Sequence, residues 1–102
     1  MSIESWDPER DGPLSERSLQ HKLERRGYSC SAYVYPPGTR FPPHSHSVDK
    51  IDAVLEGRFR ISMAGRDYVL GPGDALFVPR GEQHSAEVLG ATPVTSIDAV
   101  KS

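Results

Sequence analysis

The chain has 102 residues, a formal net charge of −2 and a single cysteine. This length allows one domain with a modest core, and it needs neither a disulfide nor a structural metal to fold. The weak charge gives no basic surface for nucleic acid, no apolar run is long enough to span a membrane, and the first residues, MSIESWDPER, do not resemble a signal peptide. We therefore expect a cytoplasmic protein with no nucleic-acid or membrane partner.

The first predicted segment is an irregular arm over residues 1–13. It contains Trp6, two prolines and several charges without a hydrophobic period. The tryptophan has three possible fates: it covers an apolar patch on the body of the protein, covers one on a second subunit, or lies on the surface without a role.

One short helix is predicted over residues 14–27. Ser15 can cap its start, and Gly27 is a natural stop. Leu19 and Leu23 lie four residues apart and form a narrow apolar stripe. That stripe must pack against a larger apolar surface.

From residue 28 onward the hydrophobic period changes from helical to two, as in β-strands. Turn residues, mainly glycine and proline, recur about every ten residues between the strand-like runs. The predicted strands are 28–35, 51–55, 58–63, 68–70, 75–78, 84–89 and 93–100. This pattern is typical of an all-β sandwich or barrel.

Three of the four histidines, His44, His46 and His84, fall beside turns at the ends of predicted strands. Residues i and i+2 of a strand point to the same face, so His44 and His46 can direct both imidazoles to one interior point. Imidazole suits zinc, iron, nickel, copper and cobalt. A pair of polar residues at a strand start is the alternative explanation of the HxH pattern.

Two spaced motifs surround these histidines. The first runs from Gly38 to His46 as G(x)5HxH, and Gly57 lies where a closing glycine would fall. The second runs from Gly73 to His84 as G(x)5PxG(x)2H. In order and spacing the two motifs resemble those of the cupins, over roughly residues 38–88.

The resemblance implies a cupin-type, jelly-roll-like β-barrel over residues 28–102, with the arm and short α-helix of residues 1–27 packed on it. It also implies a homodimer, since small cupins commonly dimerise. The implied metal ligands are His44, His46 and His84. The family's fourth ligand, a glutamate, falls on Lys50, and the asparagine that often ends the second motif falls on Val88.

Lys50 is therefore the departure to explain. Strand alternation places Lys50 and Asp52 on the interior face and Ile51 and Ala53 on the opposite face. Two unit charges about 4 Å apart interact by roughly 4 kcal/mol at an effective dielectric near 20, and a divalent ion doubles that energy. A protonated Lys50 aimed at the ion would remove much of the affinity that three imidazoles supply.

Four arrangements remain open. Lys50 pairs with Asp49 or Asp52 and leaves a three-histidine site; or Asp49 or Asp52 takes the place of the missing carboxylate. Alternatively, the surroundings deprotonate the amine and make it a reactive base. In the fourth arrangement the pocket holds no metal and Lys50 binds an anionic ligand directly.

The predicted function follows from these residues. We expect a divalent transition metal (Fe, Ni, Zn, Mn, Co or Cu) at the three histidines, with Lys50 and Asp52 as candidate catalytic groups and a small polar or anionic molecule as ligand or substrate. If the protein is an enzyme, a metal-dependent oxygenase or isomerase is favoured. The alternatives are a binding or sensor module, metal-free or non-catalytic, in which Lys50 replaces the glutamate, and a stable barrel whose site has decayed.

Overall fold

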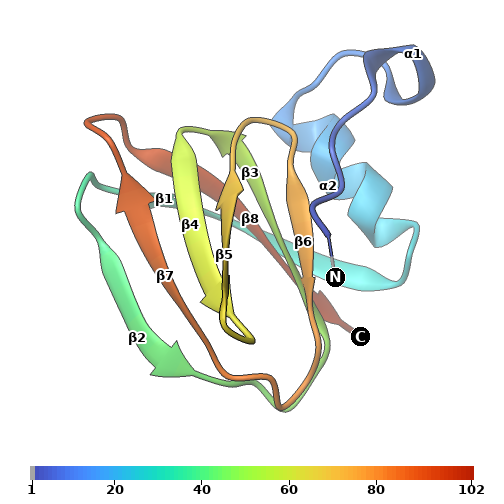
Figure 1. Ribbon diagram of the computed structural model, residues 1–102. Coiled ribbons are helices and arrows are strands. Elements are labelled where there is room, and N and C mark those ends of the chain that lie inside the picture. Colours follow the sequence, from blue (N-terminus) through green and yellow to red (C-terminus); the bar gives the residue numbers. More distant parts are fainter. Residues whose placement is uncertain (1) are drawn as a thin grey trace.

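The computed structural model describes residues 2–102 as two four-stranded antiparallel sheets that lie face to face, with two short helices on one side (Figure 1). The first sheet has the order β1 (Tyr28–Tyr35), β8 (Val94–Lys101), β3 (Lys50–Glu56) and β6 (Ala75–Val78). The second has the order β2 (Arg40–His44), β7 (His84–Leu89), β4 (Arg58–Met63) and β5 (Arg66–Leu70). The all-β, jelly-roll-like prediction is confirmed.

One strand was not predicted. β2 contains Pro42 and Pro43, which break most strand patterns because proline cannot donate to a ladder. Here β2 is an edge strand and pairs with β7 alone, so the missing donors cost little. Its pairing is irregular between Phe41 and His44, where the two prolines lie. The edge position is what the sequence could not reveal.

The N-terminal arm is more ordered than predicted. It contains a single helical turn, α1 (Pro8–Asp11), in which Asp7 accepts the Glu9 N–H as a cap. The arm also pairs with the free edge of β6, through two 2.8 Å hydrogen bonds between the backbones of Glu4 and Ala75. The helical turn and the bridge were not predicted, because four residues are too few to show a hydrophobic period.

The predicted helix is present as α2 (Glu16–Glu24). Ser15 caps it and accepts the Ser18 N–H at 3.0 Å, while the Ser18 hydroxyl accepts the Ser15 N–H. Leu19 and Leu23 are 2% and 1% exposed, as the apolar stripe required.

Two apolar clusters hold the layers together. The first fills the space between the sheets and consists of Val54, Phe59, Ile61, Met63, Tyr68, Leu70, Leu76, Val78, Val88 and Val94. The second lies between the helices and the outer face of the first sheet and consists of Leu19, Leu23, Ile51, Ala53, Ala75, Ile97 and Ala99. Strand β3 is therefore buried on both faces, and its alternation divides Ile51 and Ala53 from the inward Lys50 and Asp52 as predicted.

Trp6 covers the body of its own subunit. Its ring packs on the helix-side cluster, and its Nε1 donates to the Gly12 carbonyl at 2.9 Å. A Cβ on Gly73 would lie 2.5 Å from the Cβ of Trp6, so the glycine is what permits this approach. The arm does not need a partner subunit for its tryptophan.

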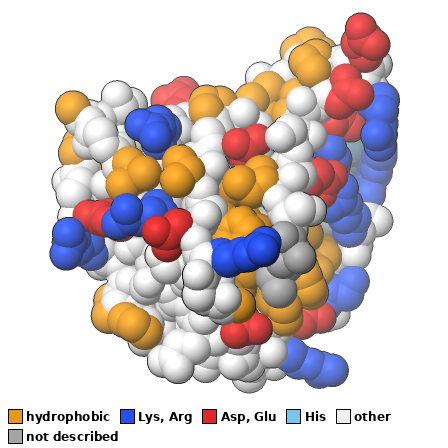
Figure 2. Space-filling model, viewed as in Figure 1, with side chains coloured by type: hydrophobic (Ala, Val, Ile, Leu, Met, Phe, Trp, Pro, Cys, Tyr) orange, Lys and Arg blue, Asp and Glu red, His pale blue; other side chains and the backbone are white. Residues whose placement is uncertain are grey.

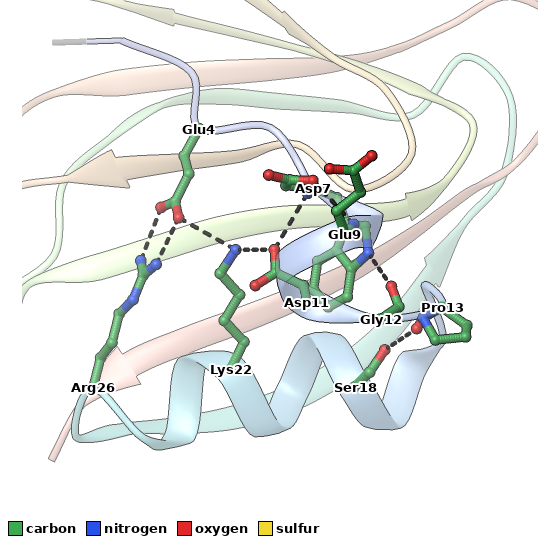
Figure 3. A network of polar contacts seen from close by, with 10 residues as sticks. Glu4, Asp7, Glu9, Asp11, Gly12, Pro13, Ser18, Lys22 and Arg26 are labelled. Carbon is green, nitrogen blue, oxygen red and sulfur yellow. Dashed lines mark hydrogen bonds and ion pairs between the residues drawn. The ribbon is translucent and has the colours of Figure 1, made fainter.

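Charged side chains fasten the arm to α2. Figure 3 shows Glu4 between Arg26 and Lys22, and Lys22 reaching on to Asp11. Figure 2 shows acidic and basic side chains crowded along the edge of the molecule where Figure 1 places the helices. Within residues 2–102, neither helix has the length and apolar character to cross a membrane.

Candidate metal centre

The three predicted histidines meet at one end of the space between the sheets. His44 ends β2 and His84 begins β7, and the two are direct cross-strand partners with ring centroids 4.3 Å apart. The ring of His46 lies 4.9 Å from that of His44 and 5.2 Å from that of His84. One nitrogen from each ring lies within 4.8 Å of the other two, so the trio could hold a metal ion.

His46 reaches this position by a route that differs from the predicted one. Strand β2 ends at His44, so His46 is not its i+2 neighbour on a strand face. Instead, the His46 carbonyl accepts the Gly81 N–H at 2.8 Å, which ties this segment to the turn before β7. The predicted convergence is present, but strand alternation explains only part of it.

In His44 and His84, a hydrogen bond at one ring nitrogen leaves the other nitrogen free to bind a metal. The Nδ1 atom of His44 lies 2.7 Å from the Pro42 carbonyl oxygen, and that of His84 lies 3.0 Å from the Glu82 carbonyl oxygen. A carbonyl oxygen can only accept, so each Nδ1 carries the hydrogen and each Nε2 keeps its lone pair. Metal-binding histidines generally show this second contact, which fixes ring orientation and tautomer.

The ring of His46 tests directly whether these residues suit a metal ion. Nε2 of His46 is buried and has no hydrogen-bond partner, a costly condition for a polar atom. Burial, and next the positive charge of Lys50, lower the pKa of His46, so its neutral form is favoured. A neutral imidazole with an unpartnered nitrogen beside two oriented Nε2 atoms is a donor set that fits a transition metal.

Beside the histidines, Lys50 lies between two carboxylates. Its Nζ atom is 2.5 Å from Oδ1 of Asp98 and 3.5 Å from Oδ1 of Asp52. Asp98, on β8, is the cross-strand partner of Asp52 on β3, so both acids point between the sheets. Asp98 was not predicted as a site residue, although the period of the strand predicted at 93–100 could have indicated an acid in an inward position.

These contacts decide the protonation of Lys50. Burial lowers the pKa of its ammonium group, but Asp52 and Asp98 outweigh burial and the pKa is raised overall. For Asp52 the balance is reversed: burial raises the pKa of the carboxyl group by more than Lys50 lowers it. A raised pKa favours the protonated amine over the alternative in which Lys50 is a deprotonated base. The pairing of Lys50 with Asp52 is present, with Asp98 as a second partner.

Asp49 is not brought to the site. Its carboxylate accepts the Arg80 N–H at 2.9 Å, and its carbonyl accepts the Lys101 N–H at 2.9 Å. In the part of the chain that the structure describes, the metal-capable group consists of the three histidines and includes no carboxylate. Neither Asp49 nor Asp52 belongs to this group, and coordination by either stays a prediction.

A cavity of about 260 Å³ adjoins both groups. Its polar lining comprises His44, His46, His84, Lys50, Asp52, Asp98 and Ser96, and its apolar lining comprises Tyr35, Phe41, Phe59 and Ala86. Tyr35 shows which face of β1 turns inward. Burial, and next the charges of Asp98 and Asp52, raise the pKa of the Tyr35 hydroxyl to about 12, so it stays protonated.

Fold and site together define a small antiparallel β-barrel protein with a three-histidine centre able to hold a metal. The family model described as the cupin domain matches residues 32–100, and the chain therefore belongs to the cupin family. The resemblance of the two motifs is confirmed.

Three known proteins illustrate the range of relatives. The chain is 42% identical over 67 residues to the bifunctional lysine-specific demethylase and histidyl-hydroxylase NO66 of Branchiostoma floridae, covering 62% of this chain and 11% of that protein. It is 38% identical over 60 residues to the dimethylsulfoniopropionate lyase DddQ of Ruegeria pomeroyi, covering 56% of this chain and 30% of that protein. The structure of KdgF from Halomonas sp. is similar with a TM-score of 0.65 and 25% identity, over 74% of this chain and 70% of that one. The chain thus spans about a tenth and under a third of the two curated relatives.

Proposed function

We propose that this cupin binds one divalent transition metal ion through Nε2 of His44, His46 and His84 and holds a small polar or anionic molecule in the adjoining cavity. The observation that carries the proposal is the buried, unpartnered Nε2 of His46 beside two rings whose Nδ1 atoms are already engaged. A bound ion would act as a Lewis acid on the ligand. Three neutral ligands leave its charge in place, which favours an anionic or chelating molecule.

The cavity limits the ligand. Its volume of about 260 Å³ lies just below the usual range of about 300–1,000 Å³ for small-molecule sites, which favours a ligand of few heavy atoms. The Lys50 ammonium has three hydrogens. Asp98 and Asp52 form ion pairs with it, and as a donor in the cavity it could also bind an oxygen atom of the ligand.

An enzymatic role needs a group that moves protons. Asp52 is the candidate, because burial raises the pKa of its carboxyl group above its ordinary value. Lys50 stays protonated and would stabilise negative charge on the substrate. The two curated relatives are named for hydroxylase and demethylase activities and for a lyase activity. For this chain a metal-dependent oxygenase or isomerase stays the proposed enzyme class.

A second candidate is a metal-free binding or sensor pocket. It is favoured by Lys50 itself, a cation at the position where the resemblance places an acidic ligand. In that case Lys50 would bind the anionic molecule directly. The homodimer stays a prediction in either case, and a monomeric mass in light scattering would contradict it.

Elemental analysis of the untagged protein tests the proposal. We expect about one transition metal ion per chain, as purified or after loading with Fe²⁺, Ni²⁺, Zn²⁺, Mn²⁺, Co²⁺ or Cu²⁺, and loss of that metal in His84→Ala. His21→Ala is the matched control, since His21 is an exposed histidine on α2 outside the cavity. Lys50→Met tests the second candidate: a metal-free wild type beside a variant that fills would mean that Lys50 excludes metal.

A further inference from the structure

We propose that Asp98 is the positioning residue that makes the three-histidine site compatible with Lys50, and that the charge balance of the Lys50–Asp98 pair sets the metal affinity. The inference rests on the proposed metal binding. It assigns a function to a residue that neither cupin motif contains.

The geometry of the pair carries the first step. Asp98 Oδ1 lies 2.5 Å from Lys50 Nζ, while the nearer Asp52 oxygen lies 3.5 Å away. The two side chains of the closer pair are 10% and 26% exposed, so solvent screens their interaction only in part. Asp98 is therefore the closer of the two carboxylates that balance the charge of the ammonium group.

The second step concerns the histidines. Lys50, Asp98 and all three histidines line one cavity. The Lys50 ammonium therefore shares this small cavity with the nitrogens that would hold the ion. Without Asp98, a dication at the histidines would face a less compensated positive charge across a partly dry space, where charges interact strongly. With Asp98 in place, the Lys50–Asp98 pair has no net charge, so the metal ion lies near a neutral pair and not near an isolated ammonium group.

The wild type and three variants can be compared by the net charge of the Lys50–Asp98 pair. The pair carries zero net charge in the wild type, one positive charge in Asp98→Asn, one negative charge in Lys50→Met, and zero again in the double variant. Affinity for the dication should rise as the net charge of the pair becomes more negative. Asp98→Asn should therefore bind most weakly, Lys50→Met most tightly, and the wild type and the double variant equally. A merely structural Asp98 would instead lower stability in both variants that lack it and leave no compensation in the double variant.

The experiment measures the Co²⁺ affinity of the full chain in these four proteins, by titration of the cobalt absorption bands, together with the melting temperature of each metal-free protein. We expect Asp98→Asn to bind Co²⁺ about 10- to 100-fold more weakly, the usual range for outer partners of a metal site. Lys50→Met should bind more tightly than wild type, and Lys50→Met/Asp98→Asn should return to within about threefold of wild type. Ser96→Ala is the matched control, because Ser96 lines the same cavity two residues before Asp98 and carries no charge.

Wild-type affinity in Asp98→Asn, or a double variant as weak as Asp98→Asn, would overturn the inference while leaving metal binding intact. A wild type that binds Co²⁺ no better than His84→Ala would overturn the proposed function itself. If Asp98→Asn does not fold, the comparison of Lys50→Met with the double variant decides: equal affinities contradict the proposal, and a tenfold advantage of Lys50→Met supports it.

Discussion

His44 and His84 face each other across β2 and β7, and each places its Nδ1 on the carbonyl oxygen two residues before it. The two rings therefore follow one local rule, although β2 and β7 lie far apart in the sequence. The hydrogen bonds fix both tautomers before any ion arrives, so little orientation has to be gained on binding. Nε2 is the atom left for coordination.

This relationship predicts how substitutions of His84 should differ. The amide of glutamine reaches about as far as Nε2 of histidine, whereas the shorter amide of asparagine reaches only as far as Nδ1. We expect His84→Asn to lose metal affinity by at least about 100-fold and His84→Gln to retain more of it, as measured by Co²⁺ titration. Stronger binding by His84→Asn would indicate Nδ1 coordination and contradict the assignment.

Metal binding should stabilise the fold strongly. A ligand at 100 times its Kd adds about 2.7 kcal/mol to the free energy of unfolding. For a domain of this size that energy corresponds to a rise in melting temperature on the order of 10 °C. Thermal unfolding with and without Zn²⁺ should show this rise, and a chelator should reverse it.

His46→Ala tests the origin of that stabilisation. The variant removes the buried, unpartnered Nε2, which costs about 1–3 kcal/mol when no ion satisfies it. We therefore expect the metal-free variant to be no less stable than the metal-free wild type, and to gain nothing from Zn²⁺. A variant that Zn²⁺ stabilises as much as wild type would exclude His46 as a ligand.

The local patterns of the sequence predicted most of the fold. Alternation located β4 at its observed bounds, because one face of that strand meets the core and the period of two survives. The glycine and proline turns on either side located β6, and β7 was also predicted at its observed bounds. The cap at Ser15 and the Leu19–Leu23 stripe located α2, because the cap starts the helix and the stripe is the face that it buries. Strand β2 was missed because its prolines are tolerated only by virtue of its edge position, a property of the assembled sheet.

Some residues of the site could be predicted from the sequence, and one could not. The three histidines and Lys50 lie in or next to motifs whose spacing is visible in the sequence. Asp98 lies 14 residues beyond His84, in a strand whose register against β3 only the structure shows. The charge balance of the cavity depends on that register, so the sequence raised the question of Lys50 and could not answer it.

Gly57, the closing glycine of the first motif, has a steric explanation that predicts its tolerance to change. Its φ is +87°, and a Cβ there would lie 2.5 Å from the Pro93 carbonyl oxygen. Gly57→Ala should therefore combine left-handed strain with overpacking, together about 2–4 kcal/mol. Gly90→Ala is the matched control, since Gly90 has φ +74° with nothing within 4 Å of a Cβ, and should cost only about 1–2 kcal/mol. Equal losses in urea unfolding would show that strain alone explains Gly57.

The arm should loosen in acid. The hydrogen bond from Arg26, opposed by burial and helped by the charges of Arg26 and Lys22, lowers the pKa of Glu4 below its ordinary value of 4.5. A carboxylate with a lowered folded pKa stabilises the fold above its unfolded pKa, and this contribution is lost as the pH falls through the folded pKa. Because Glu4 is 44% exposed, the contribution should stay below about 1 kcal/mol.

The variant Glu4→Gln removes the charge of Glu4 and so measures its contribution to stability. Thermal unfolding should show the variant less stable than wild type by a constant amount above about pH 5.5, with the difference shrinking once the pH falls below 4.5. Asp11, whose pKa is lowered by its hydrogen bond from Lys22, titrates in both proteins and cancels in the comparison. Glu9→Gln is the control, because Glu9 is exposed and none of the ion pairs found in residues 2–102 includes it. Equal stability of wild type and Glu4→Gln at neutral pH would mean that the arm is held by the Glu4–Ala75 backbone pair and not by charge.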